Sequence, residues 1–281
     1  MKKLISLILA AVMLLALCAC GAADPAPADE PQTLESDETM DGALVGESDL
    51  AYVQDKGTLV VGITDFEPMD YKDENGEWIG FDADLAKAFA ESLGVAVEFI
   101  EIDWDNKVLE LNSKTVDCIW NGMTLTAEVE SAMQTSNAYC NNAQIVIVPA
   151  DVADQYQTAE DCAELQFAVE AGSAGKAEVE ALGYGFTEVA TQADALMEVA
   201  AGTSDAAVID SLMAAAMVGE DTGYADLTYT AGLNSEEYGV GFRKGSDLAD
   251  ALNTFFAQAY ADGSMLSIAE TYGVQAAVIA Q

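Results

Sequence analysis

Residues 117–126, with the sequence DCIWNGMTLT, carry the groups best suited to hold a small polar molecule. A short apolar strand is expected first, and a glycine and two threonines follow it. This order exposes backbone N–H groups and hydroxyls at the carboxyl end of a strand, where open α/β sheets bind ligands. The stretch is therefore a candidate ligand site, although strand ends that merely lead into a helix carry similar residues.

Residue types that support other chemistry are scarce. The chain has no histidine, and its cysteines do not follow the spacing of a zinc site. We expect Cys118, Cys140 and Cys162 to be buried small apolar residues, with one optional disulfide among them. No metal or other cofactor is expected.

The charge of the chain limits its partners. Ten Lys and Arg residues stand against 49 Asp and Glu residues, which gives a formal net charge of −39. Such an excess repels phosphate backbones and anionic lipid headgroups, so nucleic acid is excluded as a partner. The 281 residues, of which 51% are hydrophobic, suffice for one large or two ordinary globular domains.

The first residues are typical of a bacterial export signal. Two lysines precede an apolar run over residues 4–17, which is too short to span a membrane. The sequence LCACG then resembles a lipoprotein cleavage box, in which Cys20 would be lipidated. An ordinary cleaved signal is the alternative. Residues 1–20 are therefore expected to be the signal, and the acidic, proline-containing residues 21–48 a flexible linker to the outer face of the cytoplasmic membrane.

Strands and helices alternate beyond the linker, which predicts α/β units on largely parallel sheets. The pattern predicts, for example, a strand over residues 58–63 and a helix over 81–93. Extended runs at residues 143–149 and 238–242 are interpreted as two crossings between lobes. Lobe 1 then comprises residues 49–143 and 238–281, and lobe 2 comprises residues 144–237. Two crossings between two lobes make a hinge.

Seven groups of residues appear in an order that is typical of one protein family. They are VVG followed by FEPM (residues 60–69), GFDADLA (80–86), DWD (103–105), GMTLT (122–126), AVEAGS (168–173), DAAVID (205–210) and EYGVGFRKGS (237–246). Over roughly residues 57–275 the chain resembles the bacterial extracellular solute-binding proteins of family 3, which serve polar amino acid ABC importers. The resemblance implies the periplasmic binding protein type II fold, with a ligand cleft between the lobes. It also implies a membrane permease and an ATPase as partners.

The resemblance assigns roles to individual residues. Phe66 and Trp104 would form aromatic walls, with core packing as the alternative, and Asp210 would receive the ammonium group of the ligand. Polar contacts from the floor of lobe 1 and a loop of lobe 2 would come from Asn121, Gly122, Thr124 and Ser173.

One departure from the family concerns the carboxylate of the ligand. The family usually carries Pro-Glu-Arg after the two threonines, and its arginine binds that carboxylate. Here the residues are Ala-Glu-Val, ending in Val129, and the chain's one arginine, Arg243, lies in the return crossing. We therefore expect no cation in the cleft opposite Asp210.

Glu170 is a second departure, because some family members are basic at this position. Two carboxylates and two aromatic faces would favour a cation. We expect a small ligand with a positive amine and either no carboxylate or one held by backbone N–H groups near Thr124 and Ser173. The alternative for Glu170 is a solvent-facing position at the rim. Trp120 could belong to the core or narrow the pocket from beneath, and Met69 and Met123 could line it.

Three functions remain open at this point. The first is a lipid-anchored substrate-binding protein of an ABC importer, with an amino acid or cationic amine as ligand. The second is a dehydratase-like enzyme on the same scaffold, with Glu170 and Asp210 as acid and base. The third is a ligand-sensing partner of a separate receptor.

Overall fold

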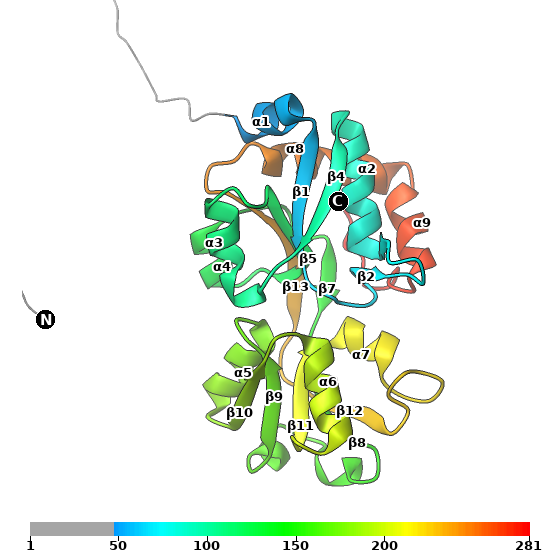
Figure 1. Ribbon diagram of the computed structural model, residues 1–281. Helices are drawn as coiled ribbons and strands as arrows, with labels where there is room; N and C mark the ends of the chain where they lie inside the picture. The colour runs from blue at the N-terminus through cyan, green and yellow to red at the C-terminus, as the bar shows by residue number, and fades with distance from the viewer. Residues whose placement is uncertain (1–47) are drawn as a thin grey trace, which may run out of the picture. The chain divides into compact units, whose positions relative to one another are not determined.

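A computed structural model describes residues 48–281. The predicted signal over residues 1–20, the lipidation site Cys20 and residues 21–47 of the predicted linker lie outside the described residues. The predicted fold class is confirmed: the structure is a mixed α/β protein with two lobes, each built around its own sheet (Figure 1).

The first sheet has the strand order β4-β1-β5-β13-β6, and β7 also pairs with β13. Strands β4, β1 and β5 are parallel, whereas β13 runs antiparallel to β5. The bounds are β1 Thr58–Ile63, β4 Ala96–Glu101, β5 Cys118–Thr124, β6 Gln134–Thr135, β7 Cys140–Asn142 and β13 Glu236–Phe242, with a separate hairpin of β2 Tyr71–Lys72 and β3 Trp78–Ile79.

The second sheet has the order β10-β9-β11-β8-β12. Its three parallel strands are β10, β9 and β11, and β8 is antiparallel to both β11 and β12. The bounds are β8 Gln144–Pro149, β9 Gln166–Glu170, β10 Gly185–Val189, β11 Ala206–Asp210 and β12 Leu227–Gly232. Strands β7 and β8 belong to different sheets but follow one another directly, as do β13 and β12 with a short connection. The chain therefore crosses between the sheets twice (Figure 1).

Helices cover both sheets. Those of lobe 1 are α1 Asp49–Lys56, α2 Phe81–Leu93, α3 Lys107–Asn112, α4 Ala127–Ala132, α8 Leu248–Ala261 and α9 Ser264–Thr271. Those of lobe 2 are α5 Ala174–Leu182, α6 Gln192–Ala201 and α7 Ser211–Met217; the short 3-10 helices are η1 Trp104–Asn106, η2 Ala153–Gln155 and η3 Glu160–Cys162.

The alternation of side chains along a strand explains why helices lie on both faces of the second sheet. Val146 and Val148 of β8 pack in one apolar cluster with Val179 of α5. Ile147, between them, packs in another cluster with Leu196 of α6. Successive residues thus face opposite helices, and the strand is apolar on both sides.

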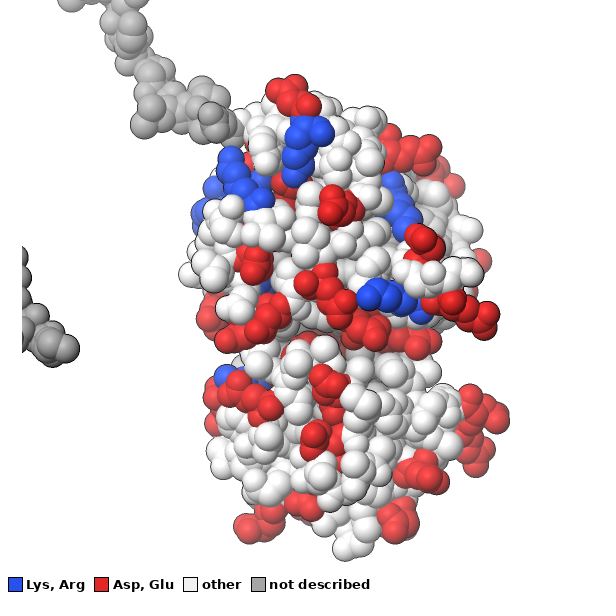
Figure 2. Space-filling view, viewed as in Figure 1, with Lys and Arg blue, Asp and Glu red and all other residues white. Residues whose placement is uncertain are grey.

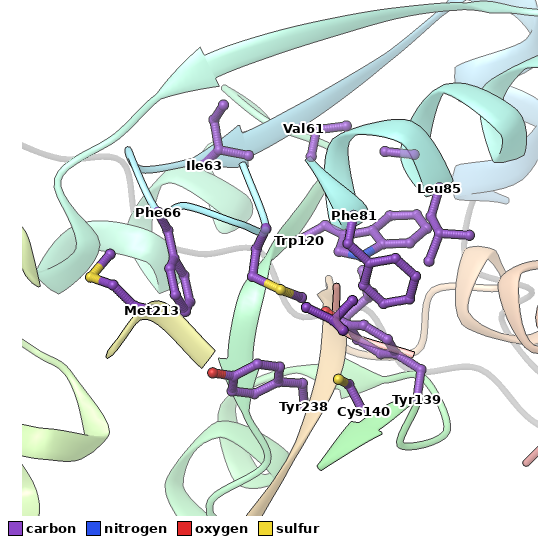
Figure 3. Packing of buried hydrophobic residues seen from close by; sticks show 14 of the residues in the cluster. Val61, Ile63, Phe66, Phe81, Leu85, Trp120, Tyr139, Cys140, Met213 and Tyr238 are labelled. Atoms are coloured by element: carbon purple, nitrogen blue, oxygen red, sulfur yellow. The ribbon is translucent and has the colours of Figure 1, made fainter. Parts of the chain in front are cut away.

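The core of lobe 1 is aromatic. Trp120 is fully buried and lies 5.6 Å from Phe256 and 6.3 Å from Phe89, measured between ring centroids. Figure 3 shows Trp120 together with Phe81 and Tyr139, away from Phe66. Trp120 is therefore a core residue, and the alternative that it narrows the pocket is wrong.

The three cysteines in the described residues are buried and free. The prediction that they are buried apolar residues is confirmed, and the optional disulfide is not formed. Burial raises the pKa of all three thiols, most strongly those of Cys118 and Cys140. They are therefore packing residues without thiolate character.

Candidate functional site

A cavity of about 490 Å³ lies between the residues of the two lobes. Its wall includes β5 and η1 from lobe 1 and the β9–α5 loop from lobe 2. All eight residues predicted to bind the ligand line this cavity: Phe66, Trp104, Asn121, Gly122, Thr124, Glu170, Ser173 and Asp210.

Asn121 is held rigidly in the floor of the cavity. Its Oδ1 accepts hydrogen bonds from the backbone N–H of Thr64 at 3.0 Å and from the Thr64 hydroxyl at 2.7 Å. Its Nδ2 donates to the carboxyl group of Asp70 at 2.8 Å. Burial, followed by the nearby charge of Asp82, raises the pKa of Asp70 well above its usual value. The floor is thus supported by a buried polar network beneath it.

Gly122 is a glycine for two physical reasons. Its φ of +54° lies in the left-handed region, and a Cβ atom there would come within 2.5 Å of Cε1 of Phe66. Its backbone N–H donates to Oδ2 of Asp82 at 2.7 Å. Phe66 can therefore lie directly on the strand and form a wall of the cavity.

Asp210 ends β11 and is 4% exposed. Its Oδ1 accepts hydrogen bonds from Tyr238 at 2.7 Å, from Gln144 at 3.0 Å and from Asn142. Its Oδ2 accepts from Gln192 alone among the described residues. Within residues 48–281, Oδ1 thus has three donors and Oδ2 only one, so Oδ2 can accept a further hydrogen bond from a ligand.

Opposing effects determine the pKa of Asp210. Burial, and next the neighbouring carboxylate of Glu236, raise its pKa to about 7, against the hydrogen bonds that lower it. Glu236 is tied into the same network, because its Oε1 accepts from Asn142 at 2.7 Å and from Gln144 at 2.8 Å. These two amides sit where the chain crosses between the sheets. Asp210 is therefore hydrogen-bonded directly to the segment that connects the two sheets.

Glu170 ends β9 and is 3% exposed, so the alternative that it faces solvent at the rim is wrong. Burial, and next the charge of Asp210, raise its pKa to about 8, whereas Lys107 lowers it. The cavity thus contains two buried carboxyl groups that are partly neutral at pH 7. A cation would allow both to ionise.

Ser173 has a structural partner of its own. Its hydroxyl accepts a hydrogen bond from the backbone N–H of Lys176 at 3.1 Å and so caps the N-terminus of α5. The preceding Gly172 has a φ of +70°, and a Cβ atom there would come within 2.7 Å of Oδ1 of Asp105. The β9–α5 loop of lobe 2 therefore touches η1 of lobe 1 at the edge of the cavity.

The expectation that no cation lines the cleft is wrong. Lys107 and Lys176 both line the cavity. Lys107 is the first residue of α3, and Lys176 belongs to the first turn of α5. Arg243, in contrast, is buried in the hinge-distal part of lobe 1, where it pairs with Asp49 at 3.0 Å.

Comparison with known proteins agrees with this geometry. Residues 59–275 match the family model described as bacterial extracellular solute-binding proteins, family 3. The chain belongs to this family.

Individual relatives share most of the chain. It is 28% identical over 260 residues to the arginine-binding extracellular protein ArtP of Bacillus subtilis, covering 90% of this chain and 91% of ArtP. It is 26% identical over 225 residues to the L-cystine-binding protein TcyJ of Escherichia coli K12, covering 78% and 84%. Among solved structures, a P235GK mutant of ArgBP from T. maritima superposes with a TM-score of 0.75 at 32% identity, covering 80% of this chain and 98% of that one.

A shorter match concerns an enzyme. The chain is 29% identical over 115 residues to cyclohexadienyl dehydratase of Pseudomonas aeruginosa, which covers 41% of this chain and 43% of the enzyme. The relatives that match over most of their length are named as binding proteins. No helix within residues 48–281 combines the length and the apolar character that crossing a bilayer requires.

Several groups around the site were not predicted to serve it. Gln192 and Tyr238 hold Asp210, and Asp82 holds Gly122. Asp82 and Tyr238 lie in family motifs, but the sequence alone does not indicate their partners. Among the apolar residues, Met123 lines the cavity as suggested, whereas Met69 is buried in the core of lobe 1.

Proposed function

We propose that this solute-binding protein captures a small amine-bearing ligand, an amino acid or a cationic amine, and delivers it to the permease and ATPase of an ABC importer. The ligand would lie in the inter-lobe cavity, with its amine near Asp210 and Glu170 and its apolar part between Phe66 and Trp104. Closure of the lobes about the two crossings would bury it.

The observation that carries this proposal is the pair of buried carboxyl groups in one cavity. The charge of Asp210 raises the cost of ionising Glu170, burial raises that cost for both groups, and both line the same cavity as Trp104. A bound cation relieves this cost, whereas an acidic ligand would add to it. Arginine and cystine, which relatives are named as binding, both carry amines.

A binding screen tests the proposal. We would measure the melting temperature and tryptophan fluorescence of the purified protein with millimolar L-arginine, L-lysine, L-histidine and L-cystine, with agmatine, cadaverine, histamine and cystamine, and with L-glutamate. A member of the set without a net negative charge should raise the melting temperature by binding the folded state, and L-glutamate, whose second carboxylate gives it a net negative charge, should not. A screen without any shift, or tight binding of L-glutamate alone, contradicts the proposal.

A pair of variants locates the site. Glu170→Gln should weaken amine binding about 10-fold or more, because it removes one charge-assisted contact. Glu164→Gln removes a charge at an exposed position of the same lobe and serves as the matched control. Equal affinities of the two variants would place the amine elsewhere.

The proposed anchor is a lipid on Cys20 at the outer face of the cytoplasmic membrane. Cells that express the full chain should retain the protein in the membrane fraction, and its N-terminal peptide should carry the mass of a diacylglyceryl group and a fatty acid. Cys20→Ala should release it. Retention of Cys20→Ala would exclude this anchor.

The second candidate is a dehydratase-like enzyme. It is favoured by the partial match to cyclohexadienyl dehydratase and by Glu170, whose raised pKa of about 8 suits a general acid. Incubation with a cyclic hydroxy acid, followed by mass spectrometry, decides between the two: a product that has lost water supports the enzyme, and unchanged substrate supports the binding protein.

A further inference from the structure

Lys107 connects the two lobes at the wall of the cavity. Its Nζ donates to the carbonyl oxygen of Trp104 at 3.1 Å and to that of Gly172, in lobe 2, at 2.9 Å. An ammonium group has three donors, and among the described residues the third has no hydrogen-bond acceptor. Lys107 thus has a donor to spare beside the space for the ligand.

Its charge is also unpaired. Among residues 48–281, Lys107 forms no ion pair with any carboxylate. Lys176, the other lysine at the cavity, is different, because its Nζ lies 3.1 Å from Oε1 of Glu188 and 3.9 Å from Oε1 of Glu180. Figure 2 shows acidic side chains over much of the face in view. Lys114 and Lys244 likewise form no ion pair among residues 48–281, so what distinguishes Lys107 is that its ammonium group lies at the cavity.

The cavity is lined by both acidic and basic groups. Asp105, Glu128 and Glu180 line it besides Glu170 and Asp210, and the charges of Asp105 and Glu128 raise the pKa of Lys107. Glu170 and Asp210 lie at the ends of the lobe 2 strands β9 and β11, and Lys107 begins α3 of lobe 1. Lys107 and Glu170 influence each other's pKa across the cavity without forming an ion pair, and burial is the largest cause that lowers the pKa of Lys107. Opposite charges that line one cavity and stay apart are complementary to a molecule that carries both an ammonium and a carboxylate.

We propose that Lys107 receives the carboxylate of an amino-acid ligand and so makes the cavity select amino acids over the corresponding decarboxylated amines. This inference rests on the proposed function and narrows its ligand class. Val129 lines the same cavity as an apolar residue, 7% exposed, and packs in one cluster with Trp104 and Val108 of the helix that Lys107 begins. The cation that the sequence lacks at position 129 is thereby supplied from the neighbouring helix.

The bond to Gly172 gives Lys107 a second effect, which the experiment must separate. Because this bond joins the lobes, losing it weakens the closed state for every ligand alike. Losing the positive charge of Lys107 weakens the binding only of ligands that carry a carboxylate. The ratio of the two dissociation constants for an amino acid and its amine therefore isolates the proposed role.

The test measures these ratios by calorimetry for L-arginine and agmatine, L-lysine and cadaverine, L-histidine and histamine, and L-cystine and cystamine. In Lys107→Met, the preference for whichever amino acid binds the wild type should fall by about 10- to 100-fold, the effect of one charge-assisted hydrogen bond. Lys107→Arg keeps the charge and should keep the preference.

Lys244→Met is the matched control. The Lys244 ammonium is likewise bound to two backbone carbonyls, of Glu130 at 2.6 Å and Met133 at 3.0 Å, but it does not line the cavity. This variant should leave the ratio unchanged. The inference is overturned if Lys107→Met changes both members of a pair equally, or neither, or if the wild type prefers the amines. A wild type that binds none of the eight compounds refutes the proposed function itself.

Discussion

The charge of Asp210 predicts that amine binding depends on pH. A cationic amine favours the ionised carboxylate, whereas burial and the carboxylate of Glu236 raise its pKa to about 7 in the empty cavity. Binding must therefore release a proton from the fraction of molecules in which Asp210 is neutral. We expect the affinity for agmatine or L-arginine, whichever binds, to increase as the pH rises from 6 to 8.

The magnitude follows from the pKa. With a value of about 7, roughly one tenth of the Asp210 side chains are ionised at pH 6 and nine tenths at pH 8. If the amine binds only the ionised form, its dissociation constant should fall about tenfold over this range. Glu170, whose pKa is raised to about 8, makes the change steeper if it also ionises on binding.

The assay is titration calorimetry at pH 6, 7 and 8. At pH 7 it is repeated in phosphate and in Tris, whose ionisation enthalpies differ, so that the number of protons released can be obtained. Asp210 alone should release about half a proton at pH 7. A dissociation constant that is flat between pH 6 and 8, or proton uptake on binding, would refute this reasoning.

The variant Glu236→Gln tests what raises the pKa of Asp210. The titratable groups that act on the pKa of Asp210 are Glu236 and the neutral Tyr238 hydroxyl, both on β13, and the charge of Asp210 acts in turn on Glu170 of β9. Removing the charge of Glu236 should lower the pKa of Asp210 and move the binding profile to lower pH. Tyr238→Phe removes a hydrogen bond that lowers this pKa and should move the profile the other way. Shifts in the same direction for both variants would contradict this account.

The stability of the empty protein should depend on pH in the opposite direction to its affinity for the amine. A carboxyl group whose pKa is raised in the folded state binds a proton that the unfolded state has already released. For Asp210, the free energy of unfolding of the empty protein should therefore decrease as the pH rises from about 4 to about 7. Denaturant titrations at pH 5 and 7 should show this loss, and a saturating amine should reduce it.

Three further variants test the geometry of the cavity. Gly122→Ala should lower the free energy of unfolding by roughly 1–3 kcal/mol, because its Cβ atom meets the ring of Phe66 at a strained φ; a melting temperature equal to that of the wild type would contradict this. Trp104→Phe should abolish the change in fluorescence on ligand binding, while the core tryptophan keeps its emission; an unchanged signal would show that Trp104 does not report closure. In the Lys107→Met background, Val129→Arg should restore the preference for amino acids over amines, measured by the same calorimetric ratio.

Much of the fold is predictable because it depends on local patterns. The helix over residues 81–93 was predicted at the bounds that the structure shows, since its apolar spacing and the following glycine define it locally. Strand β12 was not predicted, because Leu227–Gly232 is an edge strand whose pairing with β8 is a distant contact. Short α4 was missed for a similar reason, as its six residues carry little periodicity.

The candidate site divides in the same way. Its positions follow from the motifs, and all eight predicted residues line one cavity. The burial, hydrogen bonds and pKa of each side chain cannot be predicted from the motifs, because they depend on partners that are distant in the sequence. Asp210 is held by residues from four elements, and Glu170 is buried near Asp210 and Lys107, both distant from it in the sequence.

Lys107 shows why the lack of an arginine at position 129 does not define the charge of the cavity. Val129 stands where the family motif has its arginine, and the sequence therefore predicts no cation there. Helices α3 and α4 lie against one apolar cluster, so a long side chain from the first can reach space that the second leaves open. The charge of a cavity depends on all the residues that the fold brings to its wall. A cation for the ligand carboxylate can therefore come from α3 instead of α4 and still face the same cavity. A lysine at this place binds differently from an arginine, because its ammonium group donates single hydrogen bonds and lacks the planar guanidinium that pairs with both carboxylate oxygens. One of these donors is already bonded to the carbonyl oxygen of Gly172 in lobe 2. Recognition of a carboxylate and closure of the lobes would then depend on the same ammonium group.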